Sequence, residues 1–409
     1  MSFRRMFKRS ATPVVADFGS CSVKLLQLSG GEGPSIVSAQ LLEIPDEARG
    51  SADRRFAFLA DELPTVLRQG GFHGRRIVIS PASSHFMIQQ TRVEADGALS
   101  PDDQVRAEVA GRIGCAPSAV VARSFPIPGS DRDRVALAIA REEVMRHLEL
   151  MKQCRFDVVG VQPDHIPLIR SFDHLHRRDD DRHVVTMYVD AGWGAVKVAV
   201  ARGTRLVFAR IIHIGGRQFD EIAASTWGCT TAAARSRRIT EESTALDPVP
   251  PKASMMPAAT EEMSPIMRAG LAKAERDAAR SREVRAATVE VDRRTGDWNP
   301  SLSPVGSPEG HPDLAEVNDS IADELLMCAR YAQAAVGGQI DRMVMVGGES
   351  HSRRFAGHLA RRMGVKSSVG DPIRRLLAAT PEGAGPLDPA REHPEWAVAC
   401  GLCACEVEA

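Results

Sequence analysis

The sequence predicts an α/β protein, and three observations support this fold class. Short apolar stretches that are typical of strands alternate along the chain with longer amphipathic stretches that are typical of helices. A strand–turn–strand motif with the same Asp-x-Gly pattern occurs twice, at residues 17–24 and 190–197. The chain has 409 residues, of which 43% are hydrophobic and 26% are charged. That length and composition suit two or three globular domains at roughly 150 residues per domain.

The first part of the chain predicts a hairpin of two strands, followed by alternating helices and single strands. The hairpin closes through a turn of small residues at 19–22, and the first helix ends at Gly70 and Gly71. The expected strands are residues 14–18, 23–28, 77–80, 135–140 and 158–161, and the expected helices are residues 56–69, 141–154 and 166–174.

A further helix is expected to begin at Ser100. Ser100 is a good N-cap residue, a proline follows at the first helical position, and an aspartate stands at the third. Val105, Val109 and Ile113 then recur at a spacing of four residues, which predicts one apolar helix face.

The second part of the chain predicts three consecutive strands and then a series of helices and strands. A surface loop at 177–182 precedes the strands. The charged stretch 268–285 has a helical composition, and the stretch 295–312 is rich in Gly, Pro, Ser and Asn, which predicts a disordered loop. The expected strands are residues 184–190, 195–201, 205–211, 343–346 and 365–369, and the expected helices are residues 218–227, 315–336, 353–363 and 395–405.

Composition argues against several classes of protein. The net charge is −1, so the chain has no overall positive charge that would attract nucleic acid. Aromatic residues make up 5% of the chain, which argues against a surface for stacking nucleic-acid bases. The eight cysteines form no facing CxxC pairs, and the three near the C-terminus read as small core residues. We expect no signal peptide and no membrane span. The basic stretch 1–10 is either a disordered start or a short amphipathic segment that touches an anionic membrane or a partner.

The duplicated motif suggests phosphate chemistry. Its two copies read DFGSCSVK at 17–24 and DAGWGAVK at 190–197. Glycine permits close approach of the backbone, successive amides can form an anion nest, and an aspartate at the strand end can face a hydrated cation. A third element, VGGES at 346–350, places glycines between a strand and a helix. Two such hairpins could hold a polyphosphate from opposite sides.

These motifs resemble those of the actin-like ATPases, which include actin, sugar kinases, heat-shock chaperones, FtsA and MreB. The sequence looks most like the PilM family of type IV pilus assembly proteins. The resemblance also covers IHIGGRQF at 212–219 and PEWAVACGL at 394–402, in the family's order, and it weakens from about residue 230 to residue 313.

The resemblance implies two ribonuclease-H-like lobes and an inserted subdomain of the type found in FtsA and PilM. Lobe one is expected to span 11–85 and 376–409, with the insert at 86–157. Lobe two is expected to span 158–229 and 314–375, and its small subdomain 230–313.

The resemblance also implies ATP and Mg²⁺ in the cleft between the lobes. Asp17 and Asp190 would hold the metal through water, and Gln162 would orient the attacking water. Gln162 is a poor general base, so hydrolysis would be slow or absent. The other expected nucleotide-binding residues are Gly19, Ser20, Cys21, Ser22, Lys24, Gly192, Trp193, Gly194, Gly215, Gly216, Arg237, Gly347, Gly348 and Glu349.

Three positions differ from the family pattern. Trp193 is bulky for a phosphate turn, and it could stack on a neighbour or fill part of the phosphate site. Glu349 could bond a ribose hydroxyl or repel a phosphate. Arg237 or Arg238 could replace a lysine that the family supplies from a helix of lobe two.

The resulting hypothesis is a cytoplasmic, ATP-binding scaffold at the inner face of the inner membrane. It would bind the cytoplasmic N-terminal peptide of a PilN-type membrane protein within a type IV pilus or related secretion platform. Pilus motor or platform proteins are further candidate partners, and the oligomeric state is left open. The alternatives are a nucleotide-free adaptor and, less favoured, a small-molecule kinase, for which no convincing base motif occurs between residues 81 and 157.

Overall fold

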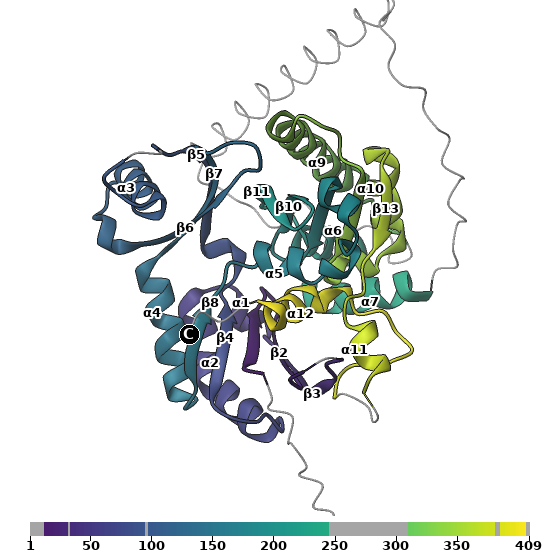
Figure 1. Ribbon diagram of the computed structural model, residues 1–409. Helices are drawn as coiled ribbons and strands as arrows, with labels where there is room; N and C mark the ends of the chain where they lie inside the picture. Colours follow the sequence, from purple (N-terminus) through teal and green to yellow (C-terminus); the bar gives the residue numbers. More distant parts are fainter. Residues whose placement is uncertain (1–11, 32, 95–96, 245–309, 381–384, 406–409) are drawn as a thin grey trace, which may run out of the picture. The chain divides into compact units, whose positions relative to one another are not determined.

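The computed structural model describes residues 12–31, 33–94, 97–244, 310–380 and 385–405. The basic stretch 1–10, the charged stretch 268–285 and most of the predicted loop at 295–312 lie outside the described residues. The fold is built on two five-stranded sheets and one three-stranded sheet (Figure 1).

The first sheet has the order β3-β2-β1-β4-β8, with antiparallel pairs among its first three strands and parallel pairs beyond them. Its strands are β1 (Val14–Phe18), β2 (Ser22–Leu28), β3 (Ile36–Glu43), β4 (Arg76–Ser80) and β8 (Asp157–Val161). All of β1 is buried, because helices cover both faces of the sheet.

The second sheet repeats this arrangement with the order β11-β10-β9-β12-β13. Its strands are β9 (Val185–Ala191), β10 (Val196–Arg202), β11 (Arg205–Ile212), β12 (Arg342–Val346) and β13 (Lys366–Val369). The two hairpins are equivalent in register as well as in sequence. Asp17 pairs with Lys24 across the first hairpin, and Asp190 pairs with Lys197 across the second.

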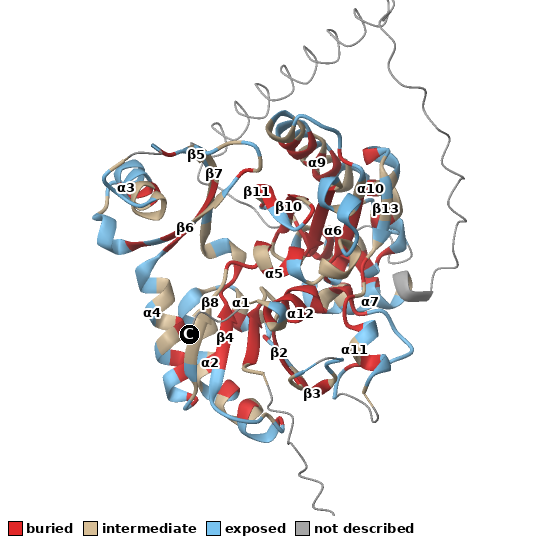
Figure 2. Ribbon diagram, viewed as in Figure 1, coloured by how far each residue is buried: buried red, intermediate tan, exposed pale blue. Residues whose placement is uncertain are grey.

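Alternating side chains of β1 belong to two different cores, and buried residues run along the neighbouring strand β4 (Figure 2). Val14, Ala16 and Phe18 pack with α2 (Ala52–Gln69) and α4 (Arg141–Gln153). Val15 packs on the opposite face with α11 (Arg374–Ala378) and α12 (Ala397–Ala404). The sheet is therefore sandwiched between helices, as a sheet with a parallel half requires.

The core of the second sheet is formed with α5 (His165–Arg170), α6 (Gly216–Trp227), α9 (Ala315–Val336) and α10 (Arg353–Met363). The predicted bounds of α9 and α10 are confirmed. Within the described ranges, no helix is long and apolar enough to cross a membrane.

A three-stranded antiparallel sheet, in the order β5-β7-β6, lies within the predicted insert. Its strands are β5 (Phe86–Arg92), β6 (Val120–Pro126) and β7 (Asp133–Ala140). One face packs on α3 (Pro101–Ile113), and residues of the other face join the core of the second sheet near β11. Ser100 caps α3 as predicted, because its hydroxyl accepts a bond from the Asp103 amide at 3.2 Å.

The structure differs from the sequence-based expectations in three respects. Strands β3, β5 and β6 were not predicted, because each mixes apolar and polar residues and none is a continuous apolar run. Ile113 is 51% exposed and does not continue the apolar face of α3. The expected start of lobe two at residue 158 falls inside β8, which pairs with β4 in the first sheet, so lobe one extends through β8.

Candidate functional site

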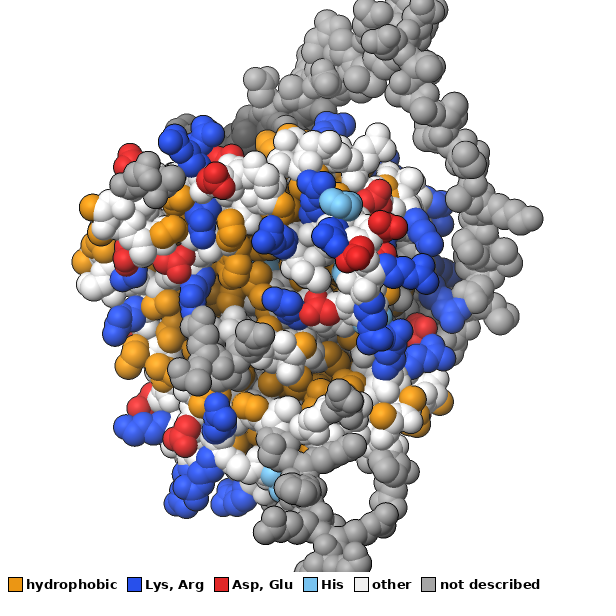
Figure 3. All heavy atoms as spheres, viewed as in Figure 1, with side chains coloured by type: hydrophobic (Ala, Val, Ile, Leu, Met, Phe, Trp, Pro, Cys, Tyr) orange, Lys and Arg blue, Asp and Glu red, His pale blue; other side chains and the backbone are white. Residues whose placement is uncertain are grey.

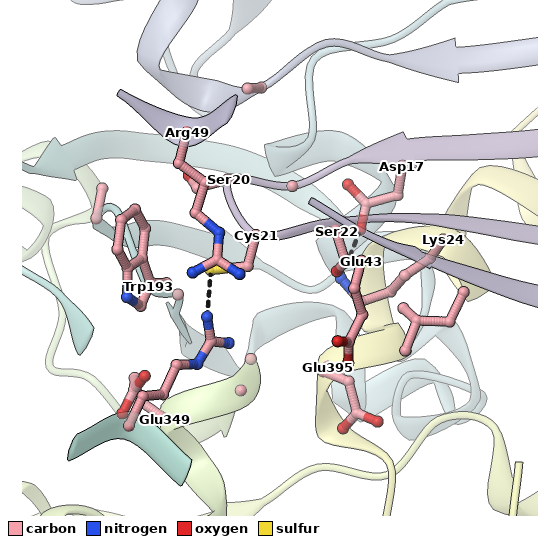
Figure 4. A pocket seen from close by; sticks show the side chains of 18 of the residues that line it. Asp17, Ser20, Cys21, Ser22, Lys24, Glu43, Arg49, Trp193, Glu349 and Glu395 are labelled. Atoms are coloured by element: carbon pink, nitrogen blue, oxygen red, sulfur yellow. Dashed lines mark hydrogen bonds and ion pairs between the residues drawn. The ribbon is translucent and has the colours of Figure 1, made fainter. Parts of the chain in front are cut away.

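The turns of the two equivalent hairpins face one polar cavity of about 840 Å³, which we call the cleft (Figure 4). Its walls also include α1 (Asp46–Arg49), α7 (Thr231–Thr244), the turn that follows β12, and Glu395 near the C-terminus. The ends of β1, β4, β9 and β12 meet here because parallel neighbours in each sheet end at the same edge.

The first hairpin turn is held from outside the cleft by Arg55 of α2. The guanidinium of Arg55 donates to the carbonyl of Gly19 at 2.5 Å and to that of Ser20 at 2.9 Å. With those two carbonyls occupied, the turn keeps a fixed shape along the cleft wall.

The second hairpin turn is held by the start of α6. The amide of Gly216 donates to the carbonyl of Gly192 at 3.1 Å, and that of Arg217 donates to the carbonyl of Trp193 at 2.8 Å. Gly215 is needed for this contact, because a Cβ there would lie 2.6 Å from the Gly192 carbonyl oxygen. The first amides of α6 are therefore used in shaping the turn.

The floor of the cleft holds paired carboxylates and ammonium groups. Lys24 Nζ lies 3.5 Å from Asp17 Oδ2 in the first hairpin. Lys197 Nζ lies 2.5 Å from Asp190 Oδ2 and 3.1 Å from Oδ2 of Asp164, which follows β8. Each aspartate is at least nine-tenths buried, so these charges interact in a low-dielectric setting.

Burial and neighbouring charge shift the pKa values of these groups in different directions. Burial raises the pKa of Asp17, although Lys24 and Lys197 oppose the shift. Burial would also raise the pKa of Asp164, but Lys197 and His165 outweigh it and hold that pKa below its usual range. Burial would lower the pKa of Lys197, but the three aspartates around it keep the pKa above its ordinary value. Asp164 and Lys197 therefore stay charged at neutral pH.

A buried network of charges forms the α7 side of the cleft. Arg238, which is 3% exposed, lies 2.8 Å from Asp220 and 2.7 Å from Glu349. The indole N–H of Trp193 donates to the other oxygen of Asp220 at 2.7 Å. Glu349 packs so closely on α6 that a Cβ at Gly216 would lie 1.9 Å from its carboxylate. Glu349 is thus neutralised by Arg238, and the indole of Trp193 is bound to Asp220.

Three of the contacts between the two lobes involve the hairpin turns. A Cβ at Gly194 would lie 2.6 Å from the hydroxyl oxygen of Ser20, so the hairpin turns approach closely. The guanidinium of Arg49 lies 5.1 Å from the ring centroid of Trp193, which is within cation–π distance. Arg235 of α7 donates to the thiol sulfur of Cys21 at 3.1 Å.

The cleft carboxylates are the kind of ligand that Mg²⁺ prefers, but they are not arranged as a preformed metal site. Asp17, Asp164 and Asp190 supply the oxygen ligands that Mg²⁺ prefers. Each of them is paired with a lysine, and among the described residues no three His, Cys, Asp or Glu side chains converge as a metal site. Mg²⁺ usually keeps several waters and binds through one or two carboxylates plus phosphate oxygens. The cleft fits that mode, in which the phosphates bring the ion.

Most of the predicted site residues line this one cavity. They are Asp17, Gly19, Ser20, Cys21, Ser22, Lys24, Asp190, Gly192, Trp193, Gly347, Gly348 and Glu349.

Five predicted residues do not line the cleft. Gln162 follows β8, and its backbone N–H donates to the carbonyl of Ile79. Gly194, Gly215 and Gly216 instead permit close approach of the Ser20 side chain, the Gly192 carbonyl and the Glu349 side chain, respectively. Arg237 faces away from the cleft: it pairs with Glu241 and lies over the ring of Trp227. Its neighbour Arg238 faces inward, because successive residues of a helix point about 100° apart.

Sequence reasoning missed several charged residues of the cleft. Lys197 repeats the position of Lys24 in the duplicated motif, and that repetition is the signal that could have identified it. Asp164 lies two residues beyond Gln162 at the carboxyl end of a strand, where functional polar groups often gather. Nothing in the sequence pattern marks the others, which are Glu43, Asp46, Glu47, Arg49, Arg235, His351, Arg391 and Glu395.

No protein-family model matches the sequence, and no curated protein is significantly similar to it. Among solved structures, a PilM–PilN type IV pilus biogenesis complex matches with a TM-score of 0.64 at 18% identity, covering 98% of this chain and 99% of that chain. The ethanolamine utilization protein EutJ from Carboxydothermus hydrogenoformans matches with a TM-score of 0.46 at 11% identity, covering 96% and 89%. The cytoplasmic domain of EpsL, an inner membrane component of the type II secretion system of Vibrio cholerae, matches with a TM-score of 0.34 at 14% identity, covering 54% and 78%.

An identity of 18% establishes likeness of fold and nothing finer. The match with PilM extends over both whole chains, and it agrees with the two sheets of equal topology and the inserted sheet. The chain therefore has the actin-like ATPase fold, with two ribonuclease-H-like lobes and an inserted subdomain of the FtsA and PilM type.

Proposed function

We propose that this protein is a PilM-like, ATP-binding scaffold at the inner face of the inner membrane, where it binds the cytoplasmic peptide of a PilN-type membrane protein. The observation that carries the proposal is the match with PilM over both whole chains, inserted subdomain included. That neighbour is described as part of a complex with PilN in type IV pilus biogenesis. A related secretion platform would use the same architecture.

The cleft supports the nucleotide part of the proposal. Two glycine turns face it from opposite lobes, each followed by a lysine that lies beside an aspartate. Backbone amides and lysines suit phosphate oxygens. Asp17 and Asp190 would hold Mg²⁺ through water, and the ion would neutralise charge on the phosphates. The turn at Gly347 and Gly348 would then border the nucleoside.

The charged floor supports slow or absent hydrolysis. Asp164 stands two residues after the predicted Gln162 in the sequence, and its side chain lines the cleft. Its pKa is lowered because Lys197 and His165 outweigh its burial, so it is a weak proton acceptor. A scaffold that uses ATP to set the closure of its lobes needs no fast turnover.

A second cavity supports the partner part of the proposal. It measures about 710 Å³ and is mostly apolar, and we call it the groove. Its walls are α3, one end of the strands of the inserted sheet and the first half of α4. Met87, Ile113 and Met145 line it and are 36%, 51% and 52% exposed. Hydrophobic side chains are visible on the surface of this subdomain, at the upper left of Figure 3. Such a groove suits a peptide with apolar anchor residues.

The first test is isothermal titration calorimetry with Mg–ATP. We expect binding by the wild type, at least tenfold weaker binding by Asp17→Ala and Asp190→Ala, and no change in Asp179→Ala, whose side chain is 94% exposed and remote from the cleft. An absence of binding by the wild type would favour the second candidate, a nucleotide-free adaptor. The contacts of Trp193 with Arg49 and of Cys21 with Arg235, which close the cleft with protein groups alone, favour that candidate.

The second test uses the N-terminal cytoplasmic peptide of a PilN-type protein from the same genome. We expect the peptide to bind the wild type and to bind Met145→Glu at least tenfold more weakly, because a charge would enter the apolar groove. Met327→Glu is the matched control, since Met327 is an exposed methionine on α9 outside the groove. Equal loss in the two variants would argue against the groove as the binding site.

A further inference from the structure

Lys197 places a positive charge among the carboxylates of the cleft floor. It stands on β10 opposite Asp190 of β9, and its ammonium lies 2.5 Å from Asp190 Oδ2 and 3.1 Å from Asp164 Oδ2. Asp17 of the first hairpin is close enough to stabilise the same charge. The side chain of Lys197 is only 14% exposed, and a lysine is rarely buried so far without a charged partner. Carboxylates from both lobes therefore surround one ammonium group.

The Asp190 carboxylate is occupied on both of its oxygens. Oδ2 is paired with Lys197. Oδ1 packs against the turn that follows β12, because a Cβ at Gly347 would collide with it. A metal ion that bound Asp190 directly would therefore have to displace the ammonium of Lys197.

The Asp164 carboxylate is held in a similar way. Its Oδ2 faces Lys197, and its Oδ1 lies 2.8 Å from Nδ1 of His165. Asp164 is 3% exposed and His165 is 1% exposed, so little solvent reaches this pair. Asp164 and Asp190 together form a position for one cation, and the ammonium of Lys197 fills it.

The equivalent lysine of the first hairpin is arranged differently. Lys24 repeats the position of Lys197 in the duplicated motif, but its ammonium lies 3.5 Å from Asp17 Oδ2. That separation is longer than the 2.7–2.9 Å or so of a charge-assisted hydrogen bond. Asp17 is therefore less tightly paired than Asp190, and it is the floor carboxylate more open to an ion held through water.

An ammonium in this position takes over part of the electrostatic role of a metal ion. Without Lys197, Asp164 and Asp190 would repel each other and any phosphate that entered the cleft. Mg²⁺ gives up its waters reluctantly. It therefore competes poorly for carboxylates that a fixed cation already holds.

We propose that Lys197 is the resident cation of the cleft floor and occupies the position between Asp164 and Asp190 that a divalent ion would otherwise take. In the absence of nucleotide the chain then binds no divalent ion at these two carboxylates. Phosphates that enter the cleft meet a floor that is already partly neutralised, so nucleotide binding depends only weakly on Mg²⁺. This last consequence rests on the proposed function, because it takes the cleft as the nucleotide site.

The first test measures the binding of a divalent ion to the full chain without nucleotide. Mn²⁺ prefers the same carboxylate ligands as Mg²⁺, and its free form is measured by electron paramagnetic resonance. We expect Lys197→Met to bind Mn²⁺ at least tenfold more tightly than the wild type, because Asp164 and Asp190 lose their cation. Lys24→Met is the matched control: it loses the same charge beside one carboxylate and should stay within threefold of the wild type.

A second variant keeps the test decisive if Lys197→Met does not fold, since two buried carboxylates without a cation destabilise a protein strongly. Lys197→Met combined with Asp164→Asn removes one carboxylate together with the ammonium and leaves the net charge of the floor unchanged. Asp190 is open in this double variant. We expect it to bind Mn²⁺ at least threefold more tightly than the wild type, and Mn²⁺ to raise its melting temperature but not that of the wild type.

The second test measures how far nucleotide binding depends on the ion. Calorimetry compares ATP in the presence of EDTA with ATP in excess Mg²⁺. We expect the wild type to bind ATP less than about threefold more weakly in EDTA. For Lys197→Met the same comparison should give a loss of at least tenfold, because the floor then carries one more uncompensated negative charge.

The outcomes separate this inference from the proposed function. Equal affinity for Mn²⁺ in the wild type and in both Lys197 variants would overturn Lys197 as the resident cation. A wild type that binds ATP with Mg²⁺ but not in EDTA would overturn the weak dependence on the ion and leave the nucleotide site standing. If the wild type binds ATP in neither condition, the nucleotide site is contradicted, whereas a gain of Mn²⁺ binding in Lys197→Met would still support the role of Lys197.

Discussion

At the scale of single residues, the difference between Arg237 and Arg238 shows what a sequence pattern leaves undecided. The two arginines are adjacent and chemically identical, and either could reach the nucleotide site. In the structure Arg238 is buried between Asp220 and Glu349, whereas the side chain of Arg237 is 43% exposed. The rotation of α7 about its own axis, set by its packing on α6, decides which of them faces the cleft.

Removal of Arg238 should destabilise the fold strongly. Arg238→Met leaves two buried carboxylates without their cation, which typically costs about 3–5 kcal/mol. Arg237→Met, the matched control, removes one exposed ion pair and a cation–π contact, and it should cost less than about 1 kcal/mol. Urea denaturation of both variants measures the two free energies of unfolding. Equal losses would contradict the assignment of Arg238 as the buried partner.

At the scale of elements, glycine sets how closely some segments pack. In α12, a Cβ at Gly401 would lie 1.7 Å from the carbonyl oxygen of Pro167 in α5. The two helices therefore touch through backbone. The sequence predicts the last helix from its apolar run, but only the packed structure shows why a glycine stands in its middle.

Two glycine-to-alanine variants should shift stability in opposite directions. Gly401→Ala must push α12 away from α5, and we expect a loss of at least about 1–3 kcal/mol. Gly111→Ala, in the last turn of α3, meets nothing within 4 Å and should stabilise the protein by up to about 0.5–1 kcal/mol, because alanine favours helix. Thermal or urea unfolding checks both. Stabilisation of the protein by Gly401→Ala would show that the two helices are not in close contact.

At the scale of the whole described unit, the hairpin turns are one of the places where the two lobes meet, besides the packing of α12 on α5 and the pair of His351 with Glu395. Ser20 of the first turn fits against Gly194 of the second, and this contact lies beside the Arg49–Trp193 and Cys21–Arg235 contacts. Small side chains at the turns therefore let the lobes approach closely on this side of the cleft. This contact also explains why Gly194 belongs to the site without lining its cavity.

Enlarging Gly194 should loosen the closure. In Gly194→Ala the new methyl group lies 2.6 Å from the Ser20 hydroxyl oxygen and 3.2 Å from its Cβ, so the Ser20 side chain must rotate and the first turn must shift by a few tenths of an ångström. We expect amide hydrogen exchange at residues 19–22 and 192–195 to become at least threefold faster. Ser20→Gly in the same background should restore slow exchange, and Ser20→Gly alone controls for the added backbone freedom. A failure of the second substitution to rescue exchange would argue against this contact.

The sequence by itself determined the fold class, most strand and helix positions, and twelve residues of the cleft. It could do so because the hairpin motif, the strand periodicity and the helix caps are local patterns, and the motif occurs twice. Only the tertiary structure decided that Gln162 and Arg237 lie outside the cleft and that Asp164, Lys197 and Arg238 lie inside it. It also brought His85, Glu143 and His147 together beneath the first hairpin. The reason is that helix rotation, strand order and the meeting of segments far apart in the chain depend on packing, which no local pattern encodes.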